Sequence, residues 1–343
     1  MTIKTIIKRY TIAAVWVYFT ILFGWLALYL VTGDRIGYVS LVNSLAVYLF
    51  FPIPLVFLIA FLVRRAEIWA GVALGSAVFL WFWGGLFIPQ PRHAQAGGET
   101  LSVMTFNVLG KQDHTHQPIA TIRAENADIV FLQELNPTLA QAIQTELAAD
   151  YPYQALAPVP GVAGMGVISK YPLHLYLQTL PAPGWVGPPQ ILSIDWNGKT
   201  VNLINFHMAP AGLGDTQRVA EVDRMREYQA KVVADFARQA GTTIAAGDAN
   251  TTSLSAAYHT LTSPLHDSWE EAGFGFGNTF PGSNIPGSSH PHIAGWPVPN
   301  WLIRIDYVFH SPEWRAISAR NARFDGVSDH RGVVVVLAYD AGD

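Results

Sequence analysis

Residues 128–134 read Asp-Ile-Val-Phe-Leu-Gln-Glu, an apolar run that ends in an amide and a carboxylate. Four successive β-branched or large apolar residues predict a buried strand, and the polar end marks where the strand stops. Similar runs recur in the second part of the chain, at residues 101–107, 166–169, 191–196, 200–206, 243–248, 302–309 and 332–339. Helical spacing is confined to three stretches there, at residues 118–127, 137–149 and 216–239.

Strands therefore outnumber helices in this part of the chain, and an Asn-Gly pair at residues 197–198 predicts a hairpin between two of them. The pattern predicts an α/β fold, a four-layer sandwich in which two packed, mainly antiparallel sheets are flanked by helices. We expect this domain to occupy residues 100–343, after a short polar linker at residues 92–99.

The first 91 residues have a different composition. Three uncharged, mostly apolar runs, Tyr10–Gly33, Ile36–Val63 and Ile68–Pro91, are each longer than the roughly 20 residues that a membrane-spanning helix needs. They predict a membrane domain over residues 1–91 with three transmembrane helices, at about 10–33, 38–63 and 68–89. A buried core helix is the alternative for any one run, but three runs this close together are hard to bury in another way.

Pro52 and Pro54 interrupt the second apolar run. They predict a kink, which membrane helices tolerate when neighbouring groups satisfy the freed carbonyls. A re-entrant hairpin is the alternative, and it would place the rest of the chain on the other side of the membrane.

Charges in the short loops predict the orientation. Basic residues lie before the first run and between the second and third, at Lys4, Lys8, Arg9, Arg64 and Arg65. The positive-inside rule places both groups in the cytoplasm. After three crossings the C-terminal domain lies outside, so we expect a multi-pass integral protein of the cell membrane with an extracytoplasmic domain. The absence of cysteine is compatible with an exported domain that has no disulfides.

The outer domain is acidic. From Glu99 onward the chain has 14 Lys and Arg against 23 Asp and Glu, a formal charge of −9. Proteins that hold long nucleic acids usually present a basic surface, because contacts with phosphates supply most of the nonspecific affinity. Net charge therefore disfavours a broad nucleic-acid interface and leaves a local basic patch open.

Most of the predicted strands have a carboxylate, amide or imidazole at one end. The sets are Thr105-Phe-Asn107, Leu132-Gln-Glu134, Asn205-Phe-His207, Gly247-Asp-Ala-Asn250, Arg304-Ile-Asp306 and Ser328-Asp-His330. Singly, each such residue more often caps a turn than binds a ligand. In this order they resemble the endonuclease/exonuclease/phosphatase superfamily, which includes deoxyribonucleases, abasic-site endonucleases, inositol polyphosphate 5-phosphatases and neutral sphingomyelinases. The resemblance covers about residues 101–339 and implies hydrolysis of phosphoesters.

The resemblance also implies a divalent cation, Mg²⁺ or Mn²⁺, with Glu134 as the first ligand, Asn107 beside it and Asp329 as a further candidate. This agrees with the preference of Mg²⁺ for hard oxygen ligands and for keeping several waters, so that one or two carboxylates suffice. A thiolate zinc site is excluded because the chain has no cysteine.

Five residues match catalytic positions of the superfamily. Asp306 and His330 look like its Asp–His pair, and Asp248 and Asn250 match its GDxN motif. His207 stands where deoxyribonuclease- and sphingomyelinase-like members have a histidine that is proposed as general acid. Because abasic-site endonucleases carry a different residue there, His207 argues against abasic-site repair. Which of these groups is acid and which is base stays open.

Other groups have open roles. Asn205 and Arg304 are predicted to bind substrate. Two histidine pairs, at residues 114 and 116 and at residues 290 and 292, have a spacing that suits a second metal, but histidines in such loops are commonly only solvated. Tryptophans in Pro- and Gly-rich loops are candidates for contact with lipid or a substrate base, with ordinary packing as the alternative, at Trp185, Trp296 and Trp301.

Together these features predict a membrane-anchored, metal-dependent phosphoesterase whose substrate is a small or lipid-linked phosphodiester or phosphomonoester. The expected partners are the lipid bilayer and the phosphoester substrate; nucleic acid remains possible, and no obligate protein partner is indicated. The alternative is an extracytoplasmic nuclease acting on DNA or RNA. A catalytically silent binding module is a third possibility, which the intact Glu134, GDxN and Ser-Asp-His positions disfavour.

Overall fold

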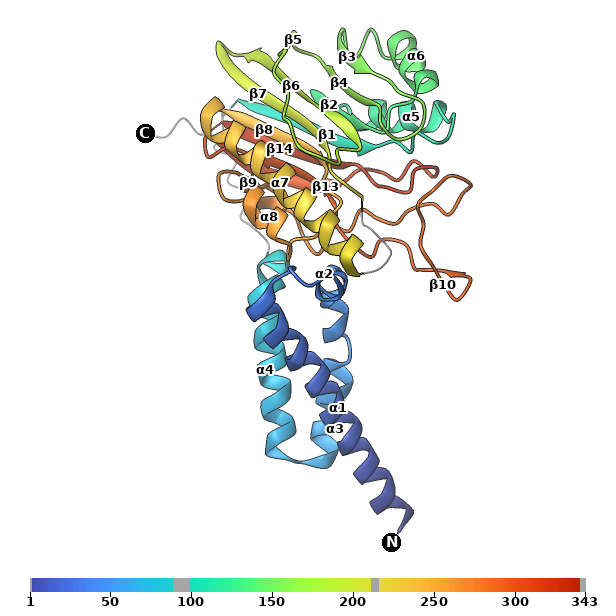
Figure 1. Cartoon of the computed structure of the whole chain (residues 1–343), viewed down its shortest axis with the longest axis vertical. Helices are drawn as coiled ribbons and strands as arrows, with labels where there is room; N and C mark the ends of the chain where they lie inside the picture. Colours follow the sequence, from blue (N-terminus) through green and yellow to red (C-terminus); the bar gives the residue numbers. More distant parts are fainter. Residues whose placement is uncertain (1, 89–98, 211–215, 340–343) are drawn as a thin grey trace.

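The computed structural model describes residues 2–88, 99–210 and 216–339. An apolar helical bundle stands at one end, and a domain built from two sheets stands on top of it (Figure 1). The predicted linker at residues 92–99 lies outside the described residues except for Glu99.

Two six-stranded sheets form the upper domain. The first has the order β13-β14-β1-β2-β4-β3, with β1 (Thr100–Asn107), β2 (Ile129–Gln133), β3 (Tyr153–Ala157), β4 (Met165–Ser169), β13 (Trp314–Asn321) and β14 (Val333–Tyr339). The second has the order β5-β6-β7-β8-β12-β9, with β5 (Leu173–Leu175), β6 (Gly187–Trp196), β7 (Lys199–His207), β8 (Thr243–Asp248), β9 (His266–Asp267) and β12 (Asp306–His310). Each sheet contains one parallel pair, β1–β2 in the first and β7–β8 in the second, and its other described pairs are antiparallel. The predicted, mainly antiparallel character is confirmed.

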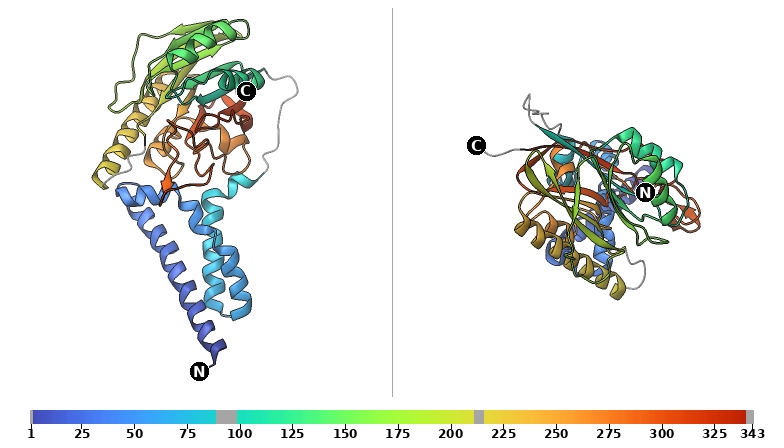
Figure 2. Two further views of the ribbon diagram at one scale, coloured as in Figure 1. Left: turned by 90° about the vertical axis from the view of Figure 1, so that its right-hand side faces the viewer. Right: turned by 90° about the horizontal axis from the view of Figure 1, so that it is seen from above.

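The two sheets pack face to face. Alternate residues of their strands point inward and form one buried core, which includes Val103 and Phe131 from the first sheet and Leu203 and Ile244 from the second. The outer face of the first sheet packs against α5 (His116–Glu125) and α6 (Pro137–Glu146), and that of the second against α7 (Thr216–Ala240) and α8 (Ala256–Leu261). The views in Figure 2 show these layers, and the predicted four-layer sandwich is confirmed.

Some elements differ from the sequence prediction. The short strands β3 and β5 and the longer β13 were not predicted. A strand was predicted to start at residue 302, but β12 starts at Asp306. Ile303 instead forms an isolated antiparallel bridge with Phe280, which diverts the preceding residues from the sheet.

The lower domain consists of α1 (Ile3–Thr32), α2 (Gly37–Ser44), η1 (Ala46–Phe50), α3 (Ile53–Val63), α4 (Ala66–Trp83) and η2 (Gly84–Phe87). Three helical stretches in it are long and apolar enough to cross a membrane: Ile3–Thr32, Ala46–Val63 and Ala66–Phe87. Their outward surfaces carry many exposed apolar side chains, as expected for helices whose solvent is lipid.

The second predicted span, 38–63, is not one continuous helix. It is divided into α2, η1 and α3, and the apolar crossing stretch starts at Ala46. Pro52 is the N-cap of α3 and Pro54 lies in its first turn, where a missing N–H breaks no helical hydrogen bond. The chain keeps its direction through this point (Figure 1), as the predicted kink requires and a re-entrant hairpin does not.

The bundle packs directly on the upper domain. The Asp34 carboxylate accepts a hydrogen bond from the Ala256 amide at 2.8 Å, and the Tyr48 hydroxyl donates to the Leu302 carbonyl at 2.7 Å. The Phe87 ring packs edge-on against Phe276. These contacts join the bundle to the segment after β8 and to the segment before β12.

Candidate active site

Polar side chains meet where strands of both sheets end. The parallel pairs β1–β2 and β7–β8 bring their carboxyl ends to the same edge, which carries Asn107, Glu134, His207 and Asp248. Asp306 begins the antiparallel strand β12 and lies directly opposite Asp248 in the register. The topology thus gathers residues that are up to 199 positions apart, from Asn107 to Asp306.

Asp248 is the centre of this cluster. Its Oδ2 lies 3.2 Å from Asn107 Nδ2, 3.4 Å from His207 Nε2 and 3.8 Å from His330 Nε2. Its Oδ1 accepts a 2.8 Å hydrogen bond from the Asn250 amide. Burial raises the pKa of Asp248, but the charge of His330 and the hydrogen bond and charge of His207 outweigh it and lower the pKa. Asp248 is therefore a buried carboxylate that stays ionised.

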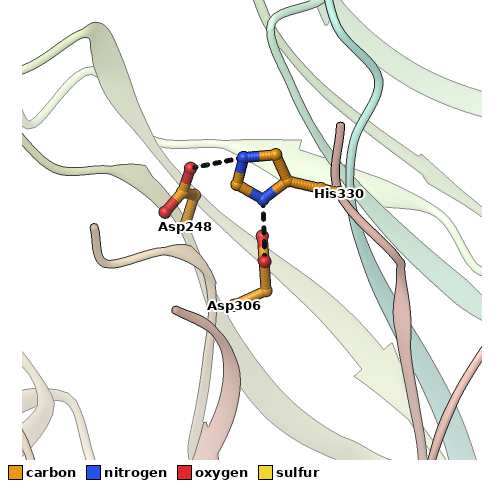
Figure 3. Close-up of side chains that lie close together, drawn as sticks. All are labelled: Asp248, Asp306 and His330. Atoms are coloured by element: carbon orange, nitrogen blue, oxygen red, sulfur yellow. Dashed lines mark hydrogen bonds and ion pairs between the residues drawn. The ribbon is translucent and has the colours of Figure 1, made fainter. Parts of the chain in front are cut away.

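His330 lies between two carboxylates (Figure 3). Its Nδ1 is 2.8 Å from Asp306 Oδ2, and its Nε2 faces Asp248. Burial alone lowers the pKa of His330, but the charges of Asp306 and Asp248 outweigh burial and raise the pKa well above its ordinary value. The ring is therefore held as a cation at neutral pH, in a position to bind an anionic oxygen.

Glu134 follows β2 in a left-handed backbone conformation, with φ of 60°. One carboxylate oxygen accepts from Asn107 Nδ2 at 3.2 Å, and the other accepts from the Gly110 amide at 3.1 Å. Burial raises the pKa of Glu134; the charge of His207 opposes this and the charge of Asp329 adds to it. Two carboxylates thus lie near each other in a buried place, an arrangement that a cation stabilises.

The side chains around Asn107 fit a hard divalent cation. The Asn107 amide lies between Glu134 and Asp248 and turns its Nδ2 toward both, while its Oδ1 accepts from the Leu109 amide at 3.2 Å. Half a turn of that amide would present Oδ1 together with the two carboxylates, the oxygen-only donor set that Mg²⁺ prefers. Asp329 is buried, and its Oδ2 accepts from the Ser289 amide at 2.5 Å.

A second group of side chains has metal-like proximity. One ligand atom from each of Asp248, Asp306 and His330 lies within 4.8 Å of the others. Both ring nitrogens of His330 already face carboxylates, Nδ1 at 2.8 Å from Asp306 and Nε2 at 3.8 Å from Asp248, which is the arrangement of an ion-paired imidazole. Glu134 and Asn107 therefore fit the cation better than this group does.

Asn205 and Arg304, which were predicted to bind substrate, make side-chain contacts inside the domain. Asn205 is fully buried between the sheets, where its Nδ2 donates to the Leu132 and Gly166 carbonyls and to Gln190, and its Oδ1 accepts from Gln133. Together these four partners use both the N–H donors and the carbonyl acceptor of the side-chain amide.

Arg304 is also buried away from the cluster. Its guanidinium pairs with Asp267 at 2.7 Å and stacks over the Tyr307 ring. Both side chains are therefore used in contacts within the domain, and substrate binding by Asn205 and Arg304 stays a prediction.

The histidines and tryptophans whose roles were left open have different surroundings in the structure. Both ring nitrogens of His290 face carbonyl oxygens, of Gly282 and Val298, so His290 offers no free ligand atom. Trp185 is partly buried and donates to the Leu180 carbonyl, whereas Trp296 is 78% exposed.

Three residues support the site although the sequence analysis assigned them no role. The Ser328 hydroxyl donates to the Asn107 carbonyl and accepts from the His330 amide, which ties two site segments together. The Phe280 ring packs on the His330 imidazole at 4.9 Å. The Arg226 guanidinium donates to the Asn250 carbonyl. Only Ser328 had a signal in the sequence, its place beside Asp329 and His330.

The chain is similar to known proteins both in its sequence profile and in its fold. The sequence profile described as Endonuclease/Exonuclease/phosphatase family matches residues 104–330. No curated protein matches the chain.

Similar solved structures include the endonuclease/exonuclease/phosphatase from Beutenbergia cavernae DSM 12333, at 23% identity and a TM-score of 0.52, covering 70% of this chain and 72% of that one. D. rerio TDP2 complexed with single strand DNA product is 18% identical with a TM-score of 0.54, covering 70% of this chain and 99% of that one. Truncated Caenorhabditis elegans TDP2 is 19% identical with a TM-score of 0.51, covering 70% and 98%. At these identities the likeness is one of fold.

Proposed function

The chain belongs to the endonuclease/exonuclease/phosphatase family, and on that premise we propose that it is a membrane-anchored, divalent-metal-dependent hydrolase of phosphoric esters. The observation that carries this proposal is the convergence of Asn107, His207 and His330 on the single carboxylate of Asp248. Such a cluster combines a base, an acid and a cationic group within reach of one phosphate.

Each side chain has a proposed role. His330, kept cationic by Asp306, binds a nonbridging phosphate oxygen. Asp248 orients the attacking water and accepts its proton. The Asn250 side-chain NH2 has two N–H groups: one donates to the Met208 carbonyl at 3.0 Å, and the other donates to the phosphate. His207, whose Nδ1 has no hydrogen-bond partner among the described residues, is the candidate acid for the leaving oxygen.

Glu134 and Asn107 are the proposed holders of the cation, with Asp329 close by. When bound there, Mg²⁺ or Mn²⁺ would neutralise negative charge that develops on the phosphate oxygens. The residues of the chain would supply orientation and proton transfer around it.

The three apolar helical stretches support the membrane anchor. The N-terminus and the loop between α3 and α4 lie at the end of the bundle away from the upper domain (Figure 1), and both are basic. The positive-inside rule therefore supports an extracytoplasmic catalytic domain.

We favour a small or lipid-linked phosphoester as substrate, because the domain from Glu99 onward is acidic and stands against a membrane bundle. The second candidate is an extracytoplasmic nuclease. Full-length protein with Mg²⁺ is incubated separately with plasmid DNA, with RNA and with phospholipid vesicles. Phosphate-ester cleavage in vesicles supports the first candidate, while DNA or RNA cleavage without release from lipid overturns it in favour of the second.

A further inference from the structure

The segment between Phe280 and Trp301 is attached to the candidate site at its base. The Gly282 amide donates to the Asp329 carbonyl at 2.6 Å, and the Ser289 amide donates to the Asp329 side chain. His290, the residue after Ser289, has one ring nitrogen against the Gly282 carbonyl and the other against the Val298 carbonyl, and it so closes the base of the segment. What the far end of this segment touches therefore bears on the position of the site.

The far end is a two-stranded hairpin, β10 (His292–Ile293) and β11 (Trp296–Pro297). Its turn consists of Ala294 and Gly295, both with positive φ, 51° and 83°, the signature of a type I′ turn. Ile293 and Trp296 are direct cross-strand partners, and they are 72% and 78% exposed. A β-branched and an aromatic side chain thus form an apolar pair at a projecting tip, without cover from the described part of the chain.

The bundle indicates where the bilayer surface lies. A hydrocarbon core of about 30 Å corresponds to roughly 20 helical residues at about 1.5 Å each. Counted from Arg9 on α1, and from Arg65 ahead of α4, this length ends near Tyr29 and near Gly85. The outer boundary therefore lies just below α2.

The hairpin tip lies at this level. Figure 1 and the left view of Figure 2 both place β10 at the height of α2, beside the upper end of the bundle. At that height α2 and its flanks also expose large apolar side chains, which are Ile36, Tyr38, Val42 and Leu45. Tryptophan is enriched where a protein meets the membrane–water interface.

We propose that the β10–β11 hairpin is a second membrane contact, in which Ile293 and Trp296 insert into the lipid interface beside α2. This rests on the proposed membrane anchoring. Through the Gly282 and Ser289 contacts with Asp329, the inserted hairpin holds one side of the site at a fixed distance from the lipid headgroups. A phosphoester in the adjoining leaflet is the substrate class that this arrangement suits.

The absence of native cysteine allows a direct test. Trp296→Cys is labelled with bimane in the full-length protein, which is then placed in nanodiscs with or without lipids that carry a spin label near the headgroup. The control is Leu175→Cys, which is 60% exposed on β5, an edge strand at the end of the upper domain away from the bundle (Figure 1). We expect spin-labelled lipid to quench bimane at position 296 and to leave it unchanged at position 175.

Two results would overturn the proposal. If iodide quenches bimane at position 296 and spin-labelled lipid does not, position 296 is in water. If neither quenches it, position 296 is covered by protein, such as a second copy of the chain. Quenching needs no turnover, so failure of the proposed hydrolase activity leaves this test intact. The double variant Ile293→Ser, Trp296→Ser should then lose several-fold turnover of a vesicle phosphoester and retain turnover of bis(p-nitrophenyl) phosphate.

Discussion

Glu134 is the residue on which the proposed cation dependence rests. Glu134→Gln keeps the shape of the side chain and removes its charge, so we expect about a 10²–10³-fold loss of turnover, as for several kcal/mol of lost charge stabilisation. The Mg²⁺ concentration for half-maximal activity should rise as well. Glu146→Gln, on an exposed position of α6, is the matched control and should change neither quantity. An unaltered Mg²⁺ dependence in Glu134→Gln would remove the proposed cation site.

The Asp306–His330 pair predicts how kcat/KM depends on pH. The charges of Asp306 and Asp248 raise the pKa of His330, so the cationic form persists to higher pH than for an ordinary histidine. If that cation binds the phosphate, kcat/KM is high below the pKa of His330 and falls above it. Asp306→Asn removes one of the two charges, lowers the pKa of His330 and should move the alkaline fall to lower pH. A pH–rate profile measures this shift. The control Asp195→Asn, at an exposed position near the end of β6, should leave the profile in place. An unshifted fall in Asp306→Asn would contradict the role of His330.

Asn205 distinguishes a structural residue from a substrate-binding one. Asn205→Leu leaves buried partners in both sheets without hydrogen bonds, at a cost of about 1–3 kcal/mol for each unsatisfied group. We expect a lower midpoint of thermal unfolding with near-normal turnover per folded molecule. The exposed Gln141→Leu change should leave the midpoint unaltered. Normal stability with lost turnover would instead support the substrate-binding prediction.

At the scale of elements, the contact between bundle and upper domain can be tested through Asp34. Asp34→Ala removes the acceptor for the Ala256 amide at the start of α8, which is worth about 0.5–2 kcal/mol by analogy with helix caps. Thermal unfolding of the full-length protein in detergent should therefore occur at lower temperature. Arg35→Ala, the exposed neighbour, is the control. Equal midpoints for the two variants would mean that this contact contributes no stability.

The sequence was most informative where a local pattern was strong. The apolar run before Glu134 and the periodic helix at 216–239 were predictable because burial and periodicity act within one element. β5 was missed because three residues carry no recognisable period, and the start of β12 was missed because Ile303 pairs with a distant residue, Phe280. Pro52 and Pro54 marked the interruption correctly, but only the structure shows that they begin a new helix.

The same distinction applies to the candidate site. The residue types of Asp248, Asp306 and His330 and their order were readable, and the register of β8 and β12 brings the two carboxylates together. The positions of Asn205 and Arg304 were not readable, because each is determined by tertiary partners far away in the chain. Asn205 and His207 are two residues apart on β7 and therefore point to the same inter-sheet face. Their depth along the strand decides that Asn205 is buried between the sheets and that His207 reaches the site.

For the whole molecule, the remaining question is which side of the membrane holds the site. Basic residues before α1 and between α3 and α4 lie at the end of the bundle away from the upper domain, and they predict that this end faces the cytoplasm. Since the chain has no cysteine, single cysteines report the side without background. In sealed right-side-out vesicles, an impermeant maleimide should label Leu175→Cys at once and Ala66→Cys only after detergent is added. Both changes spare the basic residues that set the orientation, so the reverse labelling pattern would place the catalytic domain in the cytoplasm and remove the extracytoplasmic substrate from consideration.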